Sequence, residues 1–200
     1  HKPFKQLQYP QDMLSVLYID NRVIISPIEI NHEFEKANKN TKNTPKSIEK
    51  NIRLSTKISK NIPNDLMGDP TRLNQILLNL LGNAIKFTEQ GAVNIAVDLL
   101  SEADDAVELK FSVTDTGIGI PEDKLSSIFE EFTQASNETT RKYGGTGLGL
   151  TIVKQLVEMQ SGKIAVESKE WIGSTFSFTL RYKKNLLYDE NKKIKFQAEN

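Results

Sequence analysis

The sequence predicts an α/β fold, a two-layer sandwich in which helices cover one face of a mixed β-sheet. Apolar residues alternate with polar ones in the predicted strands, so each strand has one buried face. Strands buried on both faces, as in doubly wound sheets, are apolar almost throughout. Two amphipathic helices, each with a single apolar stripe, supply the second layer. The chain has 200 residues, 38% of them hydrophobic, which is enough for one well-buried core.

Residues 1–50 contain only short structural signals. Asp12 to Ile19 has a short helical pattern, and Val23 to Ile25 is predicted to form a brief strand. Asn31 can cap a helix that must end by Pro45, because proline disfavours the helical conformation in the residue before it. This helix would be the first of the domain.

The clearest helix runs from Thr71 to Glu89, after the sequence Gly68-Asp69-Pro70. Its apolar residues recur at helical spacing without exception. They are Leu73, Ile76, Leu77, Leu80, Leu81, Ala84 and Ile85. Ahead of this helix, apolar and polar residues alternate from Ile52 to Ile58, which predicts a half-buried strand.

A hairpin is predicted next, with strands over Val93 to Leu99 and Val107 to Val113 and a turn over Ser101 to Asp105. A short helix is expected to begin at Pro121. Glu130 to Gly147 is polar, rich in threonine and glycine, and without a period. It is predicted to be a long mobile loop.

A second amphipathic helix and two strands complete the predicted domain. The helix begins at Leu148 and ends near Val157, and Gly162 lies where a C-terminal cap is expected. The strands are Lys163 to Glu167 and Ser174 to Leu180. In the second strand one face carries the apolar residues Phe176, Phe178 and Leu180.

Composition excludes several function classes. Lys and Arg total 26 and Asp and Glu total 26, so no net field would draw the chain to nucleic acid or to an acidic membrane surface. The chain has no cysteine, which excludes disulfides, thiolate metal sites and a cysteine nucleophile. No apolar run approaches the roughly 20 residues of a membrane helix. The first residues do not form a signal peptide. Any phosphate binding must therefore be local.

Asn79, Asn83 and Lys86 form a polar row on the predicted helix, since at about 100° per residue they fall within roughly 60° of one another. An amide oxygen suits Mg²⁺, and the lysine can reach a phosphate from the same side. The alternative is an ordinary polar helix edge, and the row alone does not decide between the two.

The segment Asp115-Thr116-Gly117-Ile118-Gly119-Ile120 ends a predicted strand with a carboxylate and two glycines. The carboxylate can accept a hydrogen bond from an exocyclic amine, and the glycines allow the backbone to approach a flat ring. An ordinary strand-ending turn uses the same residue types. The segment is therefore informative only in combination with the next one.

The segment Gly144-Gly145-Thr146-Gly147-Leu148-Gly149-Leu150 leads directly into the second amphipathic helix. Free amides at a helix N-terminus can bind phosphate. A Walker A pattern would need lysine at Leu150, and a dinucleotide pattern would need glycine at Leu150 or Ile152. The segment is predicted to be a phosphate loop of another type, with a flexible hinge as the alternative. Arg141 and Lys142 could close over a triphosphate and stabilise its charge, or could simply be solvated.

Four segments, in order along the chain, resemble the N, G1, F and G2 boxes of the histidine kinase ATP-binding domain. They are Asn79 to Phe87, Asp115 to Ile120, Phe129 to Phe132 and Gly145 to Leu150. Two further segments, Gly68 to Leu73 and Thr139 to Tyr143, look most like hybrid sensor kinases, and Gly173 to Phe176 resembles a final G3 box. The resemblance spans about Leu66 to Leu180.

The resemblance implies the Bergerat fold shared with gyrase, MutL and the heat-shock chaperones, with ATP under a lid from about Phe132 to Gly147. Asp115 would read the adenine amine, and Asn83 would hold Mg²⁺. Asn79 stands where gyrase-like relatives carry the glutamate that activates water. Because an amide cannot act as a base, this difference favours phosphoryl transfer over rapid hydrolysis.

The resemblance also assigns the remaining site residues by motif position. The implied catalytic residues are Asn79, Lys86 and Arg141. The implied nucleotide contacts are Asn83, Lys86, Phe87, Asp115, Gly117, Gly119, Tyr143, Gly145, Thr146, Gly147, Leu148, Gly149 and Thr175.

A complete kinase of this type carries a phosphoacceptor histidine in a helical hairpin, usually followed by an acidic residue, and His32-Glu33 fits that pattern superficially. His32 precedes Asn79 by only 47 positions, however, and a strand and Pro45 lie between them. We therefore expect the acceptor histidine outside this chain. The expected division is residues 1–22 as the end of a preceding helical hairpin or a linker, 23–182 as the catalytic domain, and 183–200 as a charged tail or linker.

The expected function is binding of ATP with Mg²⁺ and donation of the γ-phosphate to a histidine of a dimerisation domain, with a response-regulator receiver domain as a further partner. One alternative is a non-catalytic nucleotide-sensing or docking module. Another is a gyrase-type or MutL-type ATPase, which Asn79 disfavours. We expect the chain to be cytoplasmic, as part of a membrane-bound sensor, and monomeric by itself although the full protein is dimeric.

Overall fold

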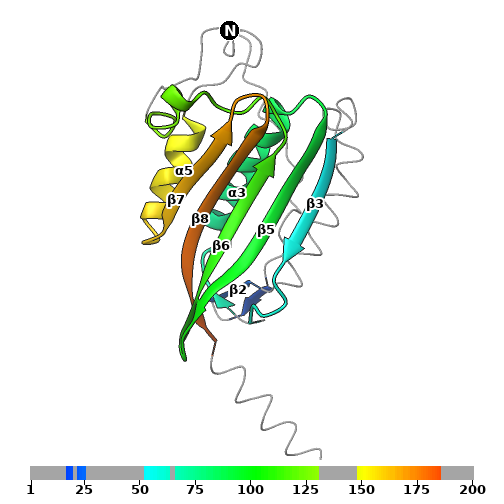
Figure 1. The fold of residues 1–200 in the computed structure, drawn as a ribbon. Coiled ribbons are helices and arrows are strands. Elements are labelled where there is room, and N and C mark those ends of the chain that lie inside the picture. The colour runs from blue at the N-terminus through cyan, green and yellow to red at the C-terminus, as the bar shows by residue number, and fades with distance from the viewer. Residues whose placement is uncertain (1–16, 20–21, 26–51, 64–65, 131–147, 186–200) are drawn as a thin grey trace, which may run out of the picture.

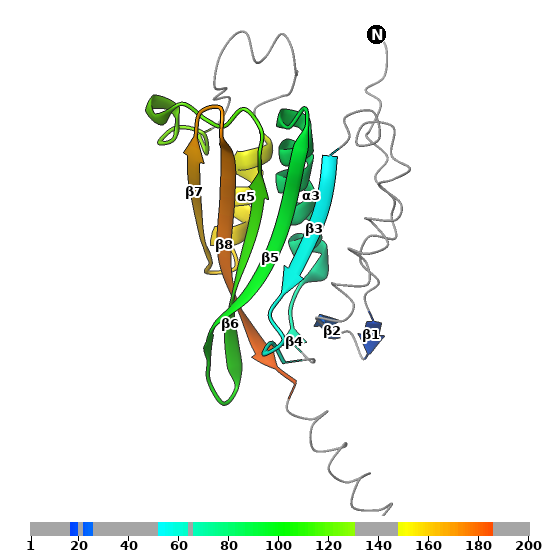
Figure 2. The same cartoon turned by 45° about the vertical axis from the view of Figure 1, so that its right-hand side comes forward.

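The computed structural model describes residues 17–19, 22–25, 52–63, 66–130 and 148–185. In this part of the chain a mixed sheet forms one layer, and the helices α3 (Pro70–Phe87) and α5 (Gly149–Glu158) form the other (Figure 1). Figure 2 shows both helices on the same face of the sheet. The predicted two-layer α/β sandwich is confirmed.

The sheet contains eight described strands in the order β1-β2-β4-β8-β6-β5-β3, with β7 paired to β8. Their bounds are β1 Leu17–Ile19, β2 Arg22–Ile25, β3 Ile52–Ile58, β4 Leu66–Met67, β5 Gly91–Glu102, β6 Ala106–Asp115, β7 Lys163–Lys169 and β8 Gly173–Lys184. Strands β3 and β5 are parallel, and the other described pairs are antiparallel. The strands predicted from alternation are therefore all present, each somewhat longer than predicted or of the same length.

Strand β1 corrects one expectation. The helical pattern predicted from Asp12 to Ile19 is wrong at Leu17–Ile19, which pairs antiparallel with β2, Tyr18 opposite Val23. Isolated helices this short are unstable, whereas the aromatic and β-branched residues within Leu17–Ile19 and Arg22–Ile25 favour strands. The helix predicted between Asn31 and Pro45 lies outside the described residues.

Helix α3 begins and ends close to the predicted bounds. Asp69 caps it, since the Asp69 Oδ1 atom accepts a hydrogen bond from the Arg72 amide at 3.1 Å, and proline occupies the first helical position, where no amide is needed. Its apolar stripe is buried against the sheet, as the side chains of Leu73, Ile76 and Leu80 show. Burial of each such side chain contributes about 1.5–3 kcal/mol relative to exposure.

Helix α5 ends in a way that differs from the expected glycine cap. The Gly162 amide donates to the Val157 carbonyl at 3.0 Å, but the residue with positive φ is Ser161, at 58°. Glycine is required at 162 for a different reason. A Cβ built there would lie 2.2 Å from the Thr179 carbonyl oxygen, so only glycine allows the chain to pass β8 this closely.

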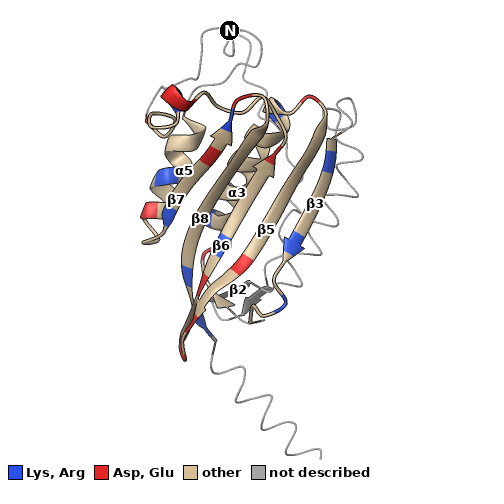
Figure 3. Ribbon diagram, viewed as in Figure 1, with Lys and Arg blue, Asp and Glu red and all other residues tan. Residues whose placement is uncertain are grey.

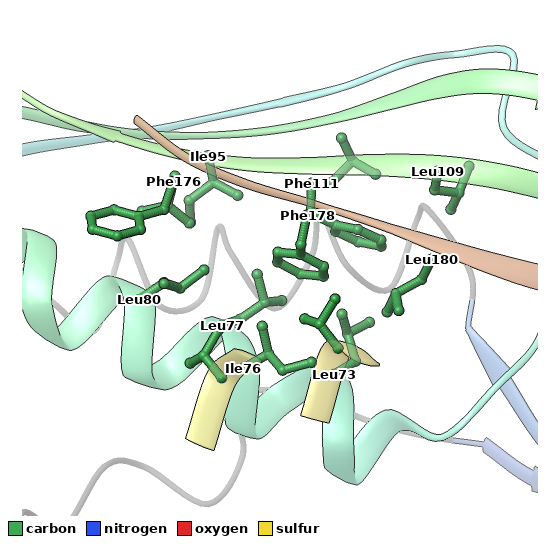
Figure 4. Packing of buried hydrophobic residues seen from close by; sticks show 14 of the residues in the cluster. Leu73, Ile76, Leu77, Leu80, Ile95, Leu109, Phe111, Phe176, Phe178 and Leu180 are labelled. Atoms are coloured by element: carbon green, nitrogen blue, oxygen red, sulfur yellow. The ribbon is translucent and has the colours of Figure 1, made fainter. Parts of the chain in front are cut away.

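The core lies between the sheet and the helices. Phe111 of β6 and Phe178 of β8 stack with ring centroids 4.8 Å apart, and Tyr182 meets Phe111 edge to face. Figure 4 shows Leu73 and Leu77 of α3 on the helix side of this aromatic pair. The predicted apolar faces of the helix and the strands thus meet in a single core.

Acidic and basic residues share the sheet (Figure 3). At the end of β8, Lys184 Nζ lies 2.6 Å from Glu102 Oε1, and Arg181 faces Asp105 at 4.0 Å. The basic end of β8 is therefore partly neutralised by the β5–β6 hairpin. Among the described residues, no helix is both long enough and apolar enough to cross a membrane.

Candidate functional site

Several of the predicted site residues converge at one end of the sandwich. Strand β6 ends there at Asp115, α3 ends there at Phe87, and α5 begins there at Gly149 (Figure 1). These elements come together because α3 and α5 pack on the same face of the sheet and β6 is one of its central strands. The site is therefore assembled from segments that are distant in the sequence.

Asp115 is a buried carboxylate at the end of β6, with only 7% of the residue exposed. Its Oδ1 atom accepts a hydrogen bond from the Gly117 amide at 2.8 Å, and the Ser174 amide also donates to the carboxylate. Burial raises the pKa of Asp115, while these two hydrogen bonds act in the opposite direction. The side chain is thus a fixed hydrogen-bond acceptor.

Gly117 and Gly119 allow the segment after β6 to fit between its neighbours. A Cβ at Gly117 would lie 2.4 Å from the Phe87 carbonyl oxygen, which also accepts a hydrogen bond from the Ile118 amide at 3.2 Å. Gly119 has a φ of +68°, and a Cβ there would lie 2.1 Å from the Lys169 carbonyl oxygen. The close approaches that these glycines permit are with protein backbone, and they hold Asp115 beside the end of α3.

Asn79 lies on α3 beside the first turn of α5. A Cβ built on Gly149 would lie 3.6 Å from the Asn79 Oδ1 atom. The Asn79 Nδ2 atom donates to the Gln75 carbonyl at 3.0 Å. Because a carbonyl can only accept, this bond fixes the orientation of the amide and turns Oδ1 away from Gln75.

The predicted polar row continues along α3 from Asn79 towards its C-terminal end. Asn83, Lys86 and Phe87 are all half-buried, and Lys86 Nζ lies 4.8 Å from the centre of the Phe87 ring. That distance is within the range of a cation–π contact. The row therefore lies on the stretch of α3 between Gly149 and Gly117.

The N-terminus of α5 differs from that of α3. Leu148 makes no side-chain cap, although its carbonyl accepts the Ile152 amide at 3.0 Å. The first amides of a helix have no partner within the helix, so they can bind an anion. Thr151, in the same turn, has a buried hydroxyl without a hydrogen-bond partner among the described residues. Sequence reasoning did not single out Thr151, because a threonine in an amphipathic helix carries no distinct signal.

Thr175 is not brought to this group. Its hydroxyl lies 3.0 Å from the Thr114 hydroxyl, and both residues alternate with the core-facing residues of their strands. Ser174 is the register partner of Asp115 and is buried on the same face. Strand parity could have found Ser174, since it shares a face with the apolar Phe176.

Some predicted site residues lie outside the described part of the chain. They are Arg141, Tyr143, Gly145, Thr146 and Gly147, together with Lys142. Their assignments remain predictions. His32, which is not expected to accept phosphate, also lies outside the described residues.

The side-chain amide oxygen of Asn83 on α3 is a donor of the type that Mg²⁺ accepts. In the described segments no cluster of histidine, cysteine, aspartate or glutamate could hold a metal by itself. Mg²⁺ commonly binds through one or two protein oxygens, nucleotide phosphates and water. The amide oxygen of Asn83 meets that requirement only if a phosphate ligand supplies further oxygens.

A family model matches the part of the chain that contains these elements. The description of the family is histidine kinase-, DNA gyrase B-, and HSP90-like ATPase, and its model matches residues 68–184. The match includes α3, the end of β6 and α5, and therefore all the site residues described above.

Curated relatives and solved structures agree with the family model. The chain is 48% identical over 141 residues to hybrid signal transduction histidine kinase L of Dictyostelium discoideum, covering 70% of this chain and 8% of that protein. It is 44% identical over 132 residues to signal transduction histidine-protein kinase BarA of Escherichia coli strain K12, covering 66% of this chain and 14% of BarA. The chain thus spans a small part of these relatives.

Among solved structures, the crystal structure of full-length ShkA in complex with AMPPNP superposes with a TM-score of 0.65 at 32% identity. The superposition covers 86% of this chain and 32% of ShkA. The catalytic domain of histidine kinase ThkA, in a nucleotide-free form, gives a TM-score of 0.59 at 28% identity and covers 80% of this chain and 94% of that domain.

Proposed function

The chain belongs to the family of histidine kinase-, DNA gyrase B- and HSP90-like ATPases, and from this premise we propose that it binds ATP with Mg²⁺ and donates the γ-phosphate to a histidine of a separate phosphoacceptor domain. The observation that carries the proposal is the placement of Asp115 and Asn79 in one site. The buried carboxylate lies at the end of β6, and Asn79 lies beside the N-terminus of α5, where Leu148 provides no side-chain cap. The Asp115 end of the site suits a nucleobase, and the α5 end suits phosphates.

Asp115 would recognise the adenine amine. The carboxylate already accepts two backbone N–H groups, which hold it in position, and its other lone pairs can accept hydrogen bonds from a ligand. Gly117 and Gly119 keep the adjoining backbone close to Phe87 and Lys169. The half-buried Phe87 would pack near the nucleotide.

The phosphates would bind at the first turn of α5. Leu148 and Gly149 would present backbone amides, and the positive end of the helix dipole favours an anion there. Asn83 would hold Mg²⁺, which when bound would neutralise charge on the phosphate oxygens. Lys86 would contact phosphate, as would Arg141.

Transfer is favoured over hydrolysis because the site has an amide at Asn79 in place of a base. The Asn79 side-chain amide nitrogen already donates a hydrogen bond to the Gln75 carbonyl, and an amide oxygen does not take up a proton near neutral pH. Asn79 would therefore orient groups near the γ-phosphate without activating water. In the proposed transfer a histidine nitrogen forms a bond to the γ-phosphorus, and the bond from phosphorus to the ADP oxygen breaks.

The remaining expectations are part of the same proposal. Tyr143, Gly145, Thr146 and Gly147 would complete the nucleotide contacts. Residues 23–182 would form the catalytic domain of a longer hybrid kinase, in the cytoplasmic part of a sensor, with a receiver domain as partner. The chain by itself would be monomeric, because dimerisation would reside in the phosphoacceptor domain.

The test is calorimetric titration of the chain with a non-hydrolysable ATP analogue in the presence of Mg²⁺. The parent should bind, and Asp115→Asn should bind at least about tenfold more weakly, since a charge-assisted hydrogen bond contributes about 1.5–3 kcal/mol. Asp98→Asn is the matched control, because Asp98 is an exposed aspartate in the middle of β5. No binding by the parent at millimolar analogue would favour a docking module without nucleotide chemistry.

A second measurement addresses transfer. Adding a histidine-containing phosphoacceptor domain from a related hybrid kinase should give labelled acceptor from γ-labelled ATP, while the chain alone should take up little label. Nucleotide binding without any labelling of the acceptor would support a nucleotide-sensing module instead.

A further inference from the structure

The hydroxyl of Ser168, on β7, joins three groups around the site. Its Oγ atom accepts a hydrogen bond from the Ile120 amide at 2.8 Å and donates to the Gly173 carbonyl at 2.9 Å. It also lies 3.0 Å from the Ser174 Oγ atom. Ser168 therefore links two segments next to Asp115. One is the segment that follows Asp115 after β6, and the other is the start of β8, where Ser174 pairs with Asp115.

The number of protons determines the direction of the bond between Ser168 and Ser174. A serine hydroxyl has one hydrogen to donate and two lone pairs to accept with. The Gly173 carbonyl can only accept, so it takes the single Ser168 hydrogen. All three contacts are hydrogen bonds only if Ser174 donates its hydrogen to Ser168. The Ser168 hydroxyl is then saturated, with one bond donated and two accepted.

Ser174 is consequently left with lone pairs alone for any further contact. It is buried, and as register partners on antiparallel strands Ser174 and Asp115 have Cβ atoms about 4.5–5.5 Å apart on the same face of the sheet. Asp115 as a carboxylate is also an acceptor. Two adjacent acceptors match the two N–H donors of an exocyclic amine and oppose a carbonyl oxygen at the same place.

We propose that Ser168 is a positioning residue that fixes Ser174 as a hydrogen-bond acceptor beside Asp115, and so selects 6-aminopurine over 6-oxopurine nucleotides. The inference rests on the proposed function and deepens it. Ser168 itself does not touch the base. Its effect passes through the orientation of one hydroxyl hydrogen, and a residue that merely stabilised the fold would not change the choice between two bases.

The experiment measures the Kd of Mg-ADP and of Mg-IDP, which carry an amine and an oxo group respectively at position 6, by calorimetry on the whole 200-residue chain. In Ser168→Ala the Ser174 hydroxyl is released and can donate to the 6-oxo group. The ratio of the Kd for IDP to the Kd for ADP should fall by about tenfold, as expected for one hydrogen bond made in place of one lost. Ser168→Thr keeps the hydroxyl and should keep the ratio of the parent.

A control variant and a second variant complete the design. Ser177→Ala removes a hydroxyl from the opposite face of β8 and should leave both Kd values unchanged. If Ser168→Ala does not fold, Ser174→Ala provides the same test. Loss of this acceptor should weaken ADP binding and should not weaken IDP binding, because the lone pairs that oppose the 6-oxo group are removed as well.

The outcomes separate this inference from the proposed function. Equal weakening of ADP and IDP in Ser168→Ala, or in Ser174→Ala, would overturn the role of Ser168 while nucleotide binding by the parent still stood. Absence of binding by the parent to either nucleotide would overturn both.

Discussion

The carbonyl oxygen of Phe87, the last residue of α3, occupies the place where a side chain on Gly117 would begin. A Cβ built on Gly117 would lie 2.4 Å from that oxygen, and the next amide, of Ile118, donates to it at 3.2 Å. Helix α3 thereby holds the segment that follows Asp115. The relationship joins two segments of the proposed nucleotide site through backbone atoms alone.

Gly117→Ala should lower both stability and nucleotide affinity. The added methyl group cannot avoid a backbone oxygen by rotating, so α3 or the segment after β6 must shift, at a cost of about 1–3 kcal/mol. Urea unfolding and calorimetric titration with an ATP analogue measure the two effects. Gly149→Ala is the control for the unfolding measurement, because a Cβ there would make only an ordinary 3.6 Å contact with Asn79 and α5 would gain a better helix former. A Gly117→Ala protein as stable as Gly149→Ala would show that the contact with Phe87 is not restrictive.

Asp115→Asn should separate function from stability. Burial raises the pKa of Asp115 in the folded chain above its unfolded value, so between these two values the folded state binds more protons. The stability associated with this group is therefore highest at acid pH and falls as pH rises through that window. At neutral pH the variant should be as stable as the parent or more stable, and its relative advantage should shrink as pH is lowered.

Urea unfolding at a series of pH values measures this difference, with Asp98→Asn as the control for loss of an exposed charge. A variant clearly less stable than the parent at neutral pH would mean that the hydrogen bonds from Gly117 and Ser174 outweigh the burial of the charge.

Trp171→Gly should stabilise the chain. Trp171 has a φ of 63° and is 78% exposed, so its strained backbone is not offset by burial. The left-handed conformation costs a residue with a side chain about 1 kcal/mol, which glycine avoids. The Trp171 amide, which donates to the Ile118 carbonyl at 2.7 Å, would be retained. Thermal unfolding should show a higher midpoint, whereas Glu170→Gly, at a position without positive φ, should lower it.

Tyr182→Phe should also stabilise the chain or leave it unchanged. The Tyr182 hydroxyl is buried and has no hydrogen-bond partner in the part of the chain that the structure describes. Burial, helped by the charge of Asp69, raises the pKa of this residue far above its ordinary range. Removing an unpartnered hydroxyl while keeping the ring can gain about 1 kcal/mol. Tyr182→Leu is the comparison, because it also removes the edge contact with Phe111 and should destabilise. Destabilisation by Tyr182→Phe would indicate a partner for the hydroxyl in solution.

The sequence by itself determined the elements whose signal is local. The apolar stripe of α3 and the alternation along β5, β6 and β8 each predict an element from residues that are close together in the sequence, and each prediction is confirmed. The family and its two-layer fold could also be predicted from the sequence, because the N, G1, F and G2 boxes occur along the chain in the order found in the family. Where the local signal was weak, as at Leu17–Ile19, the predicted helix was wrong.

Only the tertiary structure decided which residues meet at the site. The register of β6 against β8 places Ser174 beside Asp115 and leaves Thr175 facing Thr114 on the other side of the sheet. A shift of one residue in that register would exchange the two faces, so motif position alone could not choose between Ser174 and Thr175. The contact between Phe87 and Gly117 likewise depends on packing between distant segments. Local periodicity encodes which face of an element is buried, whereas the partner of each residue on that face is set by long-range pairing.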